Sequence, residues 1–114
     1  MRDFLKITKA LGDKTRVRIL KMLQQKMMCV CEVRAVLGIA QSTTSKHLQI
    51  LEDAGLIKRT KEGLWVNYAI DENSRNPFAG QIINDLTGMF NDDPQVKADI
   101  EKAKRASRFE LCPR

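Results

Sequence analysis

The sequence predicts a mainly α-helical fold with one small β-hairpin. Apolar residues recur with helical spacing over most of the chain, glycines interrupt that spacing, and residues 56–70 change to a strand-like composition. Residues 27–37 and 39–54 are expected to form consecutive helices, with a turn of three or four residues beginning at Gly38. Two such helices followed by a hairpin are typical of a winged helix-turn-helix.

The length of 114 residues is that of one small domain. We therefore expect a single winged-helix domain over residues 1–114, with its core at about residues 11–70. Residues 71–114 are expected to be a helical, dimerising C-terminal part.

The first two helices are marked by turn and cap residues. Residues 2–11 form a short amphipathic pattern that ends at Gly12, and Asp13 is a good N-cap for a helix over residues 14–24. A carboxylate at this position can accept a hydrogen bond from an unpaired amide of the first turn. The cations of this second helix are expected to face outward: Arg16, Arg18 and Lys21.

Two further helices are predicted near the C-terminus. Asn76-Pro77 reads as N-cap and first helical residue of a helix to about Phe90, and Asp93-Pro94 repeats this signal before a helix to about Ser107. The apolar faces of the first helix and the 77–90 helix exceed what so small a domain can cover. We therefore expect a homodimer through the first and C-terminal helices. The alternative is that the apolar residues of the 77–90 helix belong to the intramolecular core and not to a dimer interface: Phe78, Ile82, Leu86 and Met89.

The helix at residues 39–54 has one apolar face and one polar face. Thr44, Leu48 and Leu51 recur at i, i+4 and i+7 and should pack inward. Its outward side chains are hydroxyls, amides and cations, which suit base edges and phosphates in a DNA major groove. Ala40 is a weak N-cap, so Ser42 is an alternative cap.

The hairpin carries a cluster of positive charge. Strands are expected at residues 56–60 and 64–70, with Lys61-Glu62-Gly63 at the tip, where the glycine allows a tight turn. Lys58, Arg59 and Lys61 could then lie along a phosphate backbone.

The charge of the chain is concentrated in its first part. Residues 1–70 hold 13 lysines and arginines against 6 aspartates and glutamates, a net +7, whereas residues 71–114 hold 7 against 8, a net −1. This asymmetry favours a nucleic-acid partner.

Membrane, secreted and enzymatic classes have little support. No apolar run approaches the ~18 residues of a membrane span, and residues 1–14 lack the apolar stretch of a secretory signal. The odd number of cysteines argues against a disulfide framework, so we expect a cytoplasmic protein with no membrane partner. We find no nucleophile–base pair, glycine-rich phosphate loop or paired carboxylates, and do not expect an enzyme.

Cys29 and Cys31 lie at the start of the helix that precedes the DNA-reading helix. Thiolates bind soft ions, and a helix N-terminus lowers a thiol pKa through its dipole, so the position favours reactivity. Residues i and i+2 on a regular helix project about 200° apart, however, so both sulfurs could bind one ion only if the first turn were unwound. Cys112, a water or a small thiol could supply a third donor. The alternative is that both cysteines are small buried hydrophobic residues.

Three segments, MCVCEV, QSTTSKHLQILEDAGLI and RTKEGLWVNYAI, resemble the ArsR/SmtB family of metal-responsive winged-helix repressors over about residues 11–70. The resemblance implies a homodimer that binds an inverted repeat in double-stranded operator DNA and leaves it when an inducer binds. The DNA-contacting positions that it implies are Gln41, Ser42, Thr43, Ser45, Lys46 and His47 on the helix and Arg59, Lys61 and Gly63 on the wing.

The CVCE segment is similar to the arsenic-sensing branch, whose inducers are trivalent arsenic and antimony held by thiolates. This similarity implies Cys29 and Cys31 as ligands. In the best-known pattern of this branch, a third cysteine follows the second by three residues. That position is occupied by Arg34 here, so Cys112 is the candidate for the third thiolate ligand. No resident cofactor is implied, and Zn(II) is disfavoured because the 77–90 helix has Asp85 but no histidine. A thiol-based redox or persulfide sensor of the same fold is the alternative.

Overall fold

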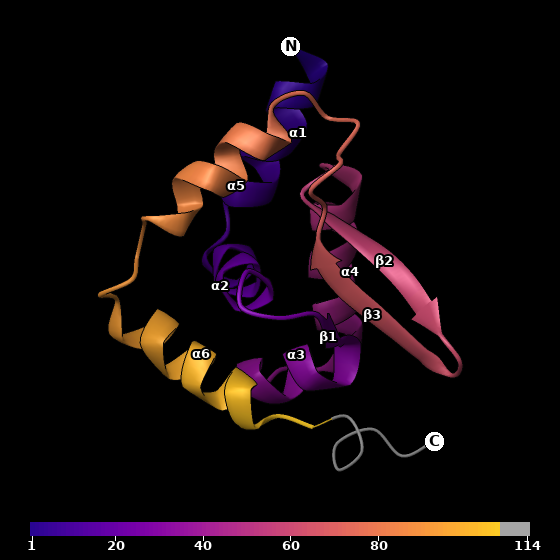
Figure 1. Ribbon diagram of the computed structural model, residues 1–114, viewed down its shortest axis with the longest axis vertical. Coiled ribbons are helices and arrows are strands. Elements are labelled where there is room, and N and C mark those ends of the chain that lie inside the picture. The colour runs from indigo at the N-terminus through magenta and orange to yellow at the C-terminus, as the bar shows by residue number, and fades with distance from the viewer. Residues whose placement is uncertain (108–114) are drawn as a thin grey trace.

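The computed structural model describes residues 1–107 and has six helices and a three-stranded antiparallel sheet in that range (Figure 1). The elements in order are α1 (Arg2–Leu11), α2 (Lys14–Leu23), β1 (Met28–Cys29), α3 (Val30–Leu37), α4 (Gln41–Asp53), β2 (Ile57–Glu62), β3 (Trp65–Ile70), α5 (Ala79–Thr87) and α6 (Pro94–Arg105). The predicted fold, mainly helical with a hairpin, is confirmed. None of the described helices is long and apolar enough to cross a bilayer.

The start of α2 follows the prediction. Asp13 is its N-cap, and the carboxylate accepts hydrogen bonds from the backbone N–H groups of Thr15 at 2.8 Å and Arg16 at 3.2 Å. Partial burial acts to raise the pKa of Asp13, but these two amide donors, with the charge of Arg16, hold that pKa below its ordinary value. The charged cap therefore stabilises the junction between α1 and α2.

The prediction that the cations of α2 face outward is wrong. Lys21 is buried, and its Nζ donates to the backbone oxygen of Leu86 at 2.9 Å and to Oδ1 of Asn91 at 2.8 Å. Burial lowers the pKa of Lys21, because the charged form loses its hydration. The physical reason is the place of α2, which the other helices surround (Figure 1).

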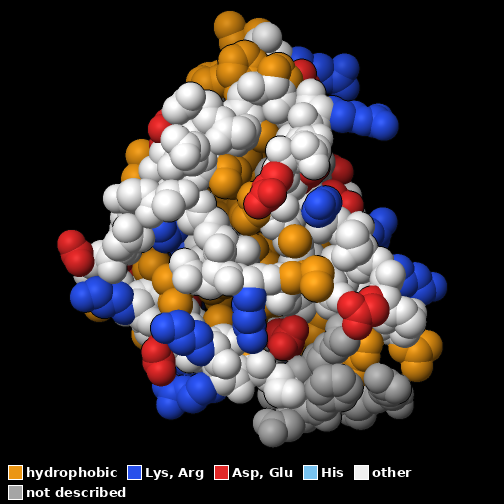
Figure 2. Space-filling model, viewed as in Figure 1, with side chains coloured by type: hydrophobic (Ala, Val, Ile, Leu, Met, Phe, Trp, Pro, Cys, Tyr) orange, Lys and Arg blue, Asp and Glu red, His pale blue; other side chains and the backbone are white. Residues whose placement is uncertain are grey.

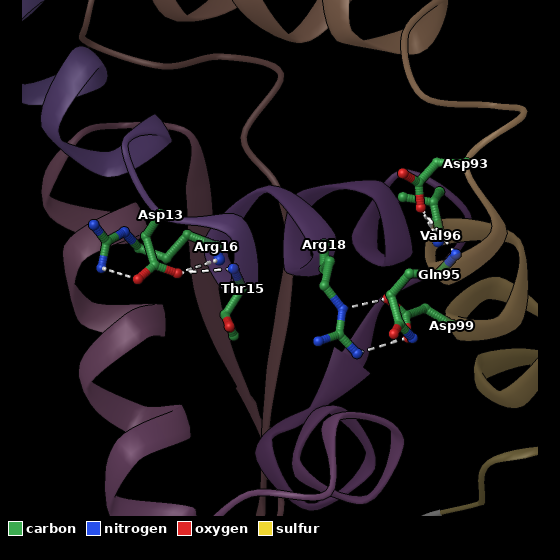
Figure 3. A network of polar contacts seen from close by, with 8 residues as sticks. All are labelled: Asp13, Thr15, Arg16, Arg18, Asp93, Gln95, Val96 and Asp99. Carbon is green, nitrogen blue, oxygen red and sulfur yellow. Dashed lines mark hydrogen bonds and ion pairs between the residues drawn. The ribbon is translucent and has the colours of Figure 1, made fainter.

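Arg18 also turns inward and joins α2 to α6. Its Nε and Nη2 donate to the two carboxylate oxygens of Asp99 at 2.7 and 2.9 Å, and Figure 3 shows the two side chains pointing toward one another. The hydrogen bonds to Asp99 raise the pKa of Arg18 above its ordinary value. Gln95 donates a further hydrogen bond to the same carboxylate at 3.0 Å.

The segment predicted as one helix from residue 27 is a short strand followed by a helix. Met28 pairs with Tyr68 and Cys29 with Asn67, so β1 lies at the edge of the sheet and α3 begins only at Val30. The sheet order is β1-β3-β2. The start of α3 is therefore fixed to the hairpin by backbone pairing.

The turn between α3 and α4 confirms the helix-turn-helix. Gly38 ends α3 with a φ of 70°, a left-handed conformation that glycine adopts without steric cost. The helix α4 begins at Gln41 with Ala40 as its N-cap, and no side chain makes the cap hydrogen bond, so the alternative that Ser42 is the cap is wrong. The hydroxyl of Thr44 instead donates to the backbone oxygen of Ala40 at 3.0 Å.

The hairpin of β2 and β3 projects away from the helices and forms the wing (Figure 1). Pairing extends from Ile57 with Ile70 to Glu62 with Trp65. Glu62 is thus still in β2 and the turn is Gly63-Leu64, one residue later than predicted. Gly63 has a φ of 59°, as a two-residue hairpin turn requires.

The helix predicted from Pro77 begins later and ends earlier than expected. Asn76 is buried, and its amide nitrogen donates to the backbone oxygens of Asp3 and Ala54, at 3.0 and 2.9 Å. Its Oδ1 accepts from the N–H of Phe78, so Asn76 orders the turn before α5 and is not the N-cap. The second start signal is correct: Asp93 caps α6 by accepting from Gln95 N–H and Val96 N–H.

Candidate DNA-reading surface and thiol site

The helix α4 packs by one face and exposes the other. Thr44, Leu48 and Leu51 are buried, as predicted, and the two leucines pack with the core residues of α1, α2 and α3. The side chains expected to contact DNA lie on the remaining surface and are exposed, apart from a half-buried His47: Gln41, Ser42, Thr43, Ser45, Lys46 and His47. The outward face is therefore short, polar and accessible.

His47 is tied to the start of α2. Its Nδ1 lies 3.2 Å from Nη1 of Arg16, whose Nε and Nη2 donate to the backbone oxygens of Ala10 and Lys9. One guanidinium thus contacts the end of α1 and the exposed polar face of α4.

The wing presents its cations to solvent. Arg59 and Lys61 are exposed, as is the turn residue Gly63. Arg59 lies 3.8 Å from a carboxylate oxygen of Glu52, an exposed ion pair of small energetic weight that leaves the arginine accessible. Figure 2 shows Lys and Arg side chains recurring along the edge of the molecule beside α4 and the hairpin.

Cys29 occupies the N-cap position of α3 and is only 1% exposed. Its backbone N–H donates to Oε1 of Glu32 at 2.9 Å, and its side chain accepts from the N–H of Glu32, which completes a capping box. The backbone at Cys29 is extended, with φ −85° and ψ 165°. The obstacle expected for two cysteines on a regular helix therefore does not apply, because Cys29 precedes the helix.

The expectation of a lowered thiol pKa is wrong for Cys29. Burial raises the pKa of this thiol, and the negative charge of Glu32 raises it further, whereas the N–H donors of Glu32 and Cys31 act to lower it. The favourable position at a helix N-terminus is outweighed by the loss of hydration. The thiol is held protonated at neutral pH more firmly than an ordinary cysteine.

Cys29 and Cys31 share one small cluster with a tryptophan. Cys29 and Trp65 are buried together, and the half-buried Cys31 packs against them. Within residues 1–107, no three side chains of the metal-binding types are grouped closely enough to hold an ion. The described part of the chain thus contains two cysteines, Cys29 and Cys31, and Cys112, the predicted third ligand, lies outside it.

An exposed apolar surface lies on α1 and at the start of α5. Phe4 is 40% exposed, Leu5 54% and Phe78 41%, and the rings of Phe4 and Phe78 meet edge to face with centroids 5.5 Å apart. Figure 2 shows hydrophobic side chains gathered at the end of the molecule where α1 lies. Farther along α5, Leu86 is buried and Ile82 packs on the core, so the apolar face of α5 divides between the core and this surface.

Three residues near these sites were not anticipated as functional: Arg16, Glu32 and Trp65. Arg16 was expected only to face solvent, and its contact with His47 joins segments far apart in the sequence. The capping role of Glu32 has a local signal, a glutamate three residues after Cys29, which a capping-box search would find if it accepted cysteine as the cap. Trp65 carried no such signal, because its contact with the cysteines follows from the pairing of β1 with β3.

Comparisons with known proteins agree with this architecture. Residues 13–59 match the model of a family described as bacterial regulatory protein, arsR family. An uncharacterised HTH-type transcriptional regulator of Methanocaldococcus jannaschii is 49% identical over 65 residues, which are 56% of this chain and 73% of the relative. The arsenical resistance operon repressor of Bacillus subtilis is 34% identical over 77 residues, 67% of this chain and 73% of the relative.

A solved structure shows the same fold. HlyU from Vibrio cholerae superposes with a TM-score of 0.66 at 27% identity, over 78% of this chain and 92% of that one. The matched family covers the helix-turn-helix described above, from α2 to the start of β2. The chain therefore belongs to the ArsR family of winged helix-turn-helix, DNA-binding transcriptional repressors.

Proposed function

We propose that this repressor reads operator DNA with the outward face of α4 and is released when trivalent arsenic or antimony binds at Cys29 and Cys31. The reading role is supported by one observation above all, the exposed polar face of α4 opposite its buried stripe. Ser42, Ser45 and His47 would contact base edges, and Lys46 would contact the phosphate backbone.

The wing supplies contacts that do not depend on sequence. Arg59 and Lys61 are exposed cations on a strand that projects from the helices, and Gly63 lets the turn approach DNA closely. Such cations neutralise phosphates and release counterions, so their contribution falls steeply with salt.

The operator is proposed to be an inverted repeat bound by a homodimer. The exposed surface of Phe4, Leu5 and Phe78 supports self-association through α1 and α5, because an apolar patch of this kind is normally covered. A two-fold dimer would place two α4 helices in successive major grooves about 34 Å apart.

The inducer is proposed to be As(III) or Sb(III). Both are soft, thiol-binding metalloids, and Cys29 and Cys31 pack in one cluster without the helical separation that would keep them apart. The relative from Bacillus subtilis carries the name arsenical resistance operon repressor, which supports this inducer class. The third donor would be Cys112 or an outside ligand.

Two elements would carry the signal from the thiols to DNA. Cys29 caps α3, the helix that supports α4, and its strand pairs with β3 at Asn67. Trp65 lies against the cysteines and begins the second strand of the wing. Binding of a metalloid would displace the cap and the tryptophan, and would so move the reading helix and the wing together. The contacts with DNA would then differ between the free and the metalloid-bound repressor, as allosteric release requires.

The DNA-reading proposal is tested with duplexes selected by the wild-type chain from a randomised pool. Lys61→Ala should weaken binding to all duplexes about equally and reduce the salt dependence, whereas Ser45→Ala should change the preferred bases. Uniform loss from both variants would contradict this division between helix and wing.

The inducer proposal is tested with Cys29→Ser. The hydroxyl can still cap α3, so the variant should bind the selected duplex with wild-type affinity but remain bound when arsenite is added. Cys31→Ser should behave alike. Normal release of both variants by arsenite would disprove the ligand assignment, and release by oxidants alone would select a redox sensor.

A further inference from the structure

We propose that Arg16 is a positioning residue for the reading helix: it holds the imidazole of His47 as the Nε2–H tautomer and so presents a single N–H donor to DNA. This inference rests on the proposed role of His47 as a DNA contact, and it adds to the interface a residue that does not itself lie on α4.

The position of Arg16 is fixed by α1. Its side chain is 12% exposed, with Nε donating to the backbone oxygen of Ala10 at 2.8 Å and Nη2 to that of Lys9 at 3.0 Å. These oxygens belong to the last turn of α1, where backbone carbonyls lack the usual helical donors. Asp13, at 4.0 Å from Nη1, faces the same guanidinium. Because the guanidinium is planar, bonds at Nε and Nη2 also set the direction of Nη1.

That remaining nitrogen faces His47. Nη1 of Arg16 lies 3.2 Å from Nδ1 of His47, across the boundary between α2 and α4. A guanidinium can only donate hydrogen bonds, so Nδ1 must be the acceptor and cannot carry a proton. The proton of the neutral ring is therefore on Nε2, the nitrogen that does not face Arg16.

The fixed tautomer has a consequence for recognition. An Nε2–H group can donate to a phosphate oxygen or to the N7 and O6 acceptors of purines, but it cannot accept from the amino groups of cytosine or adenine. A freely rotating imidazole could offer either a donor or an acceptor. Arg16 would thus restrict His47 to acceptor sites on DNA, and would join the end of α1 to the reading surface.

The first test uses the fact that the chain contains one histidine. Nitrogen NMR of the full reduced chain, recorded at a pH where the imidazole ring is neutral, should show an unprotonated Nδ1 and a protonated Nε2. Arg16→Lys, which loses the planar fork, should give a mixture of tautomers. Arg18→Lys, an equally conservative change in the same helix facing Asp99, should leave the histidine signals as in the wild type. A wild-type ring protonated on Nδ1, or unchanged signals in Arg16→Lys, would overturn the proposal, and the wild-type spectrum decides even if a variant fails to fold.

The second test is a double-mutant cycle on the selected duplex. His47→Ala should weaken binding about tenfold, and Arg16→Lys should weaken it several-fold in the wild type but not further in His47→Ala. Equal losses from Arg16→Lys in both backgrounds would mean that Arg16 acts only on stability, so the positioning role would fail while the proposed function stands. Full affinity of His47→Ala would instead remove the assigned contact of His47 and this inference with it.

Discussion

The carboxylate of Asp99 on α6 accepts both side-chain hydrogen bonds of Arg18 on α2, with N···O distances of 2.7 and 2.9 Å, and is itself only 1% exposed. This pair fixes the C-terminal helix to the central helix of the fold (Figure 3). Since α6 also contacts α3, it helps to hold in place the helix that packs against α4.

Asp99→Asn should therefore lower the free energy of unfolding by about 3 kcal/mol, because it leaves a largely buried guanidinium without its counter-charge. Urea unfolding of the reduced chain measures this loss. Glu101→Gln on the same helix removes an exposed pair with Arg105 at 3.8 Å and should cost less than about 0.5 kcal/mol. Equal effects of the two variants would show that the pair with Arg18 has no special weight.

Glu32→Gln should make Cys29 more reactive. The negative charge of Glu32 helps to raise the pKa of the Cys29 thiol, while the amide oxygen of glutamine can still accept from the Cys29 N–H. In a chain with Cys31→Ser and Cys112→Ser, the rate of alkylation of Cys29 should rise with pH, because the thiolate is the nucleophile. That rise should occur at lower pH in Glu32→Gln, whereas Glu52→Gln, a charge change on α4, should match the parent. A rise at the same or higher pH in Glu32→Gln would contradict the assigned effect of its charge.

Leu5→Glu should separate the dimer. The side chain is 54% exposed beside Phe4 and Phe78, and a charge placed in an apolar interface loses hydration without gaining a partner. Sedimentation at micromolar concentration should give a dimer for the wild type and a monomer for Leu5→Glu. Gln25→Glu, which adds the same charge at an exposed position after α2, should remain dimeric. A monomeric wild type would disprove the dimer.

Trp65 should report ligand binding. It is the one tryptophan of the chain and packs against Cys29 and Cys31, so arsenite binding there should change its fluorescence at equimolar ligand. Cys29→Ser should abolish the change. A fluorescence response that persists in this variant would place the metalloid elsewhere, and an unaltered wild-type spectrum would count against displacement of the wing.

The elements that sequence reasoning predicted correctly have local causes. Asp13 and Asp93 cap the helices that follow them, Gly38 takes the left-handed conformation that ends α3, and the spacing of Thr44 and Leu48 identifies the buried face of α4. Each signal acts within a few residues, so it can be read without knowing the rest of the fold.

The incorrect predictions depend on distant partners. The strand at Cys29 exists because β3 pairs with it, and Asn76 is buried because Asp3 and Ala54 supply acceptors for its amide. Lys21 faces inward because Leu86 and Asn91 accept its hydrogen bonds. The raised pKa of Cys29 has the same origin, since burial is set by packing and not by the position of a residue in its own helix.

The most direct test is a count of reactive thiols. The reduced, folded protein is incubated with or without one equivalent of arsenite, and the reactive thiols are then counted in the denatured chain. The sequence contains three cysteines. If the metalloid binds at Cys29 and Cys31, arsenite protects both thiols, which leaves one reactive thiol, or none if Cys112 is also a ligand. Three reactive thiols in the presence of arsenite would contradict metalloid sensing at this site.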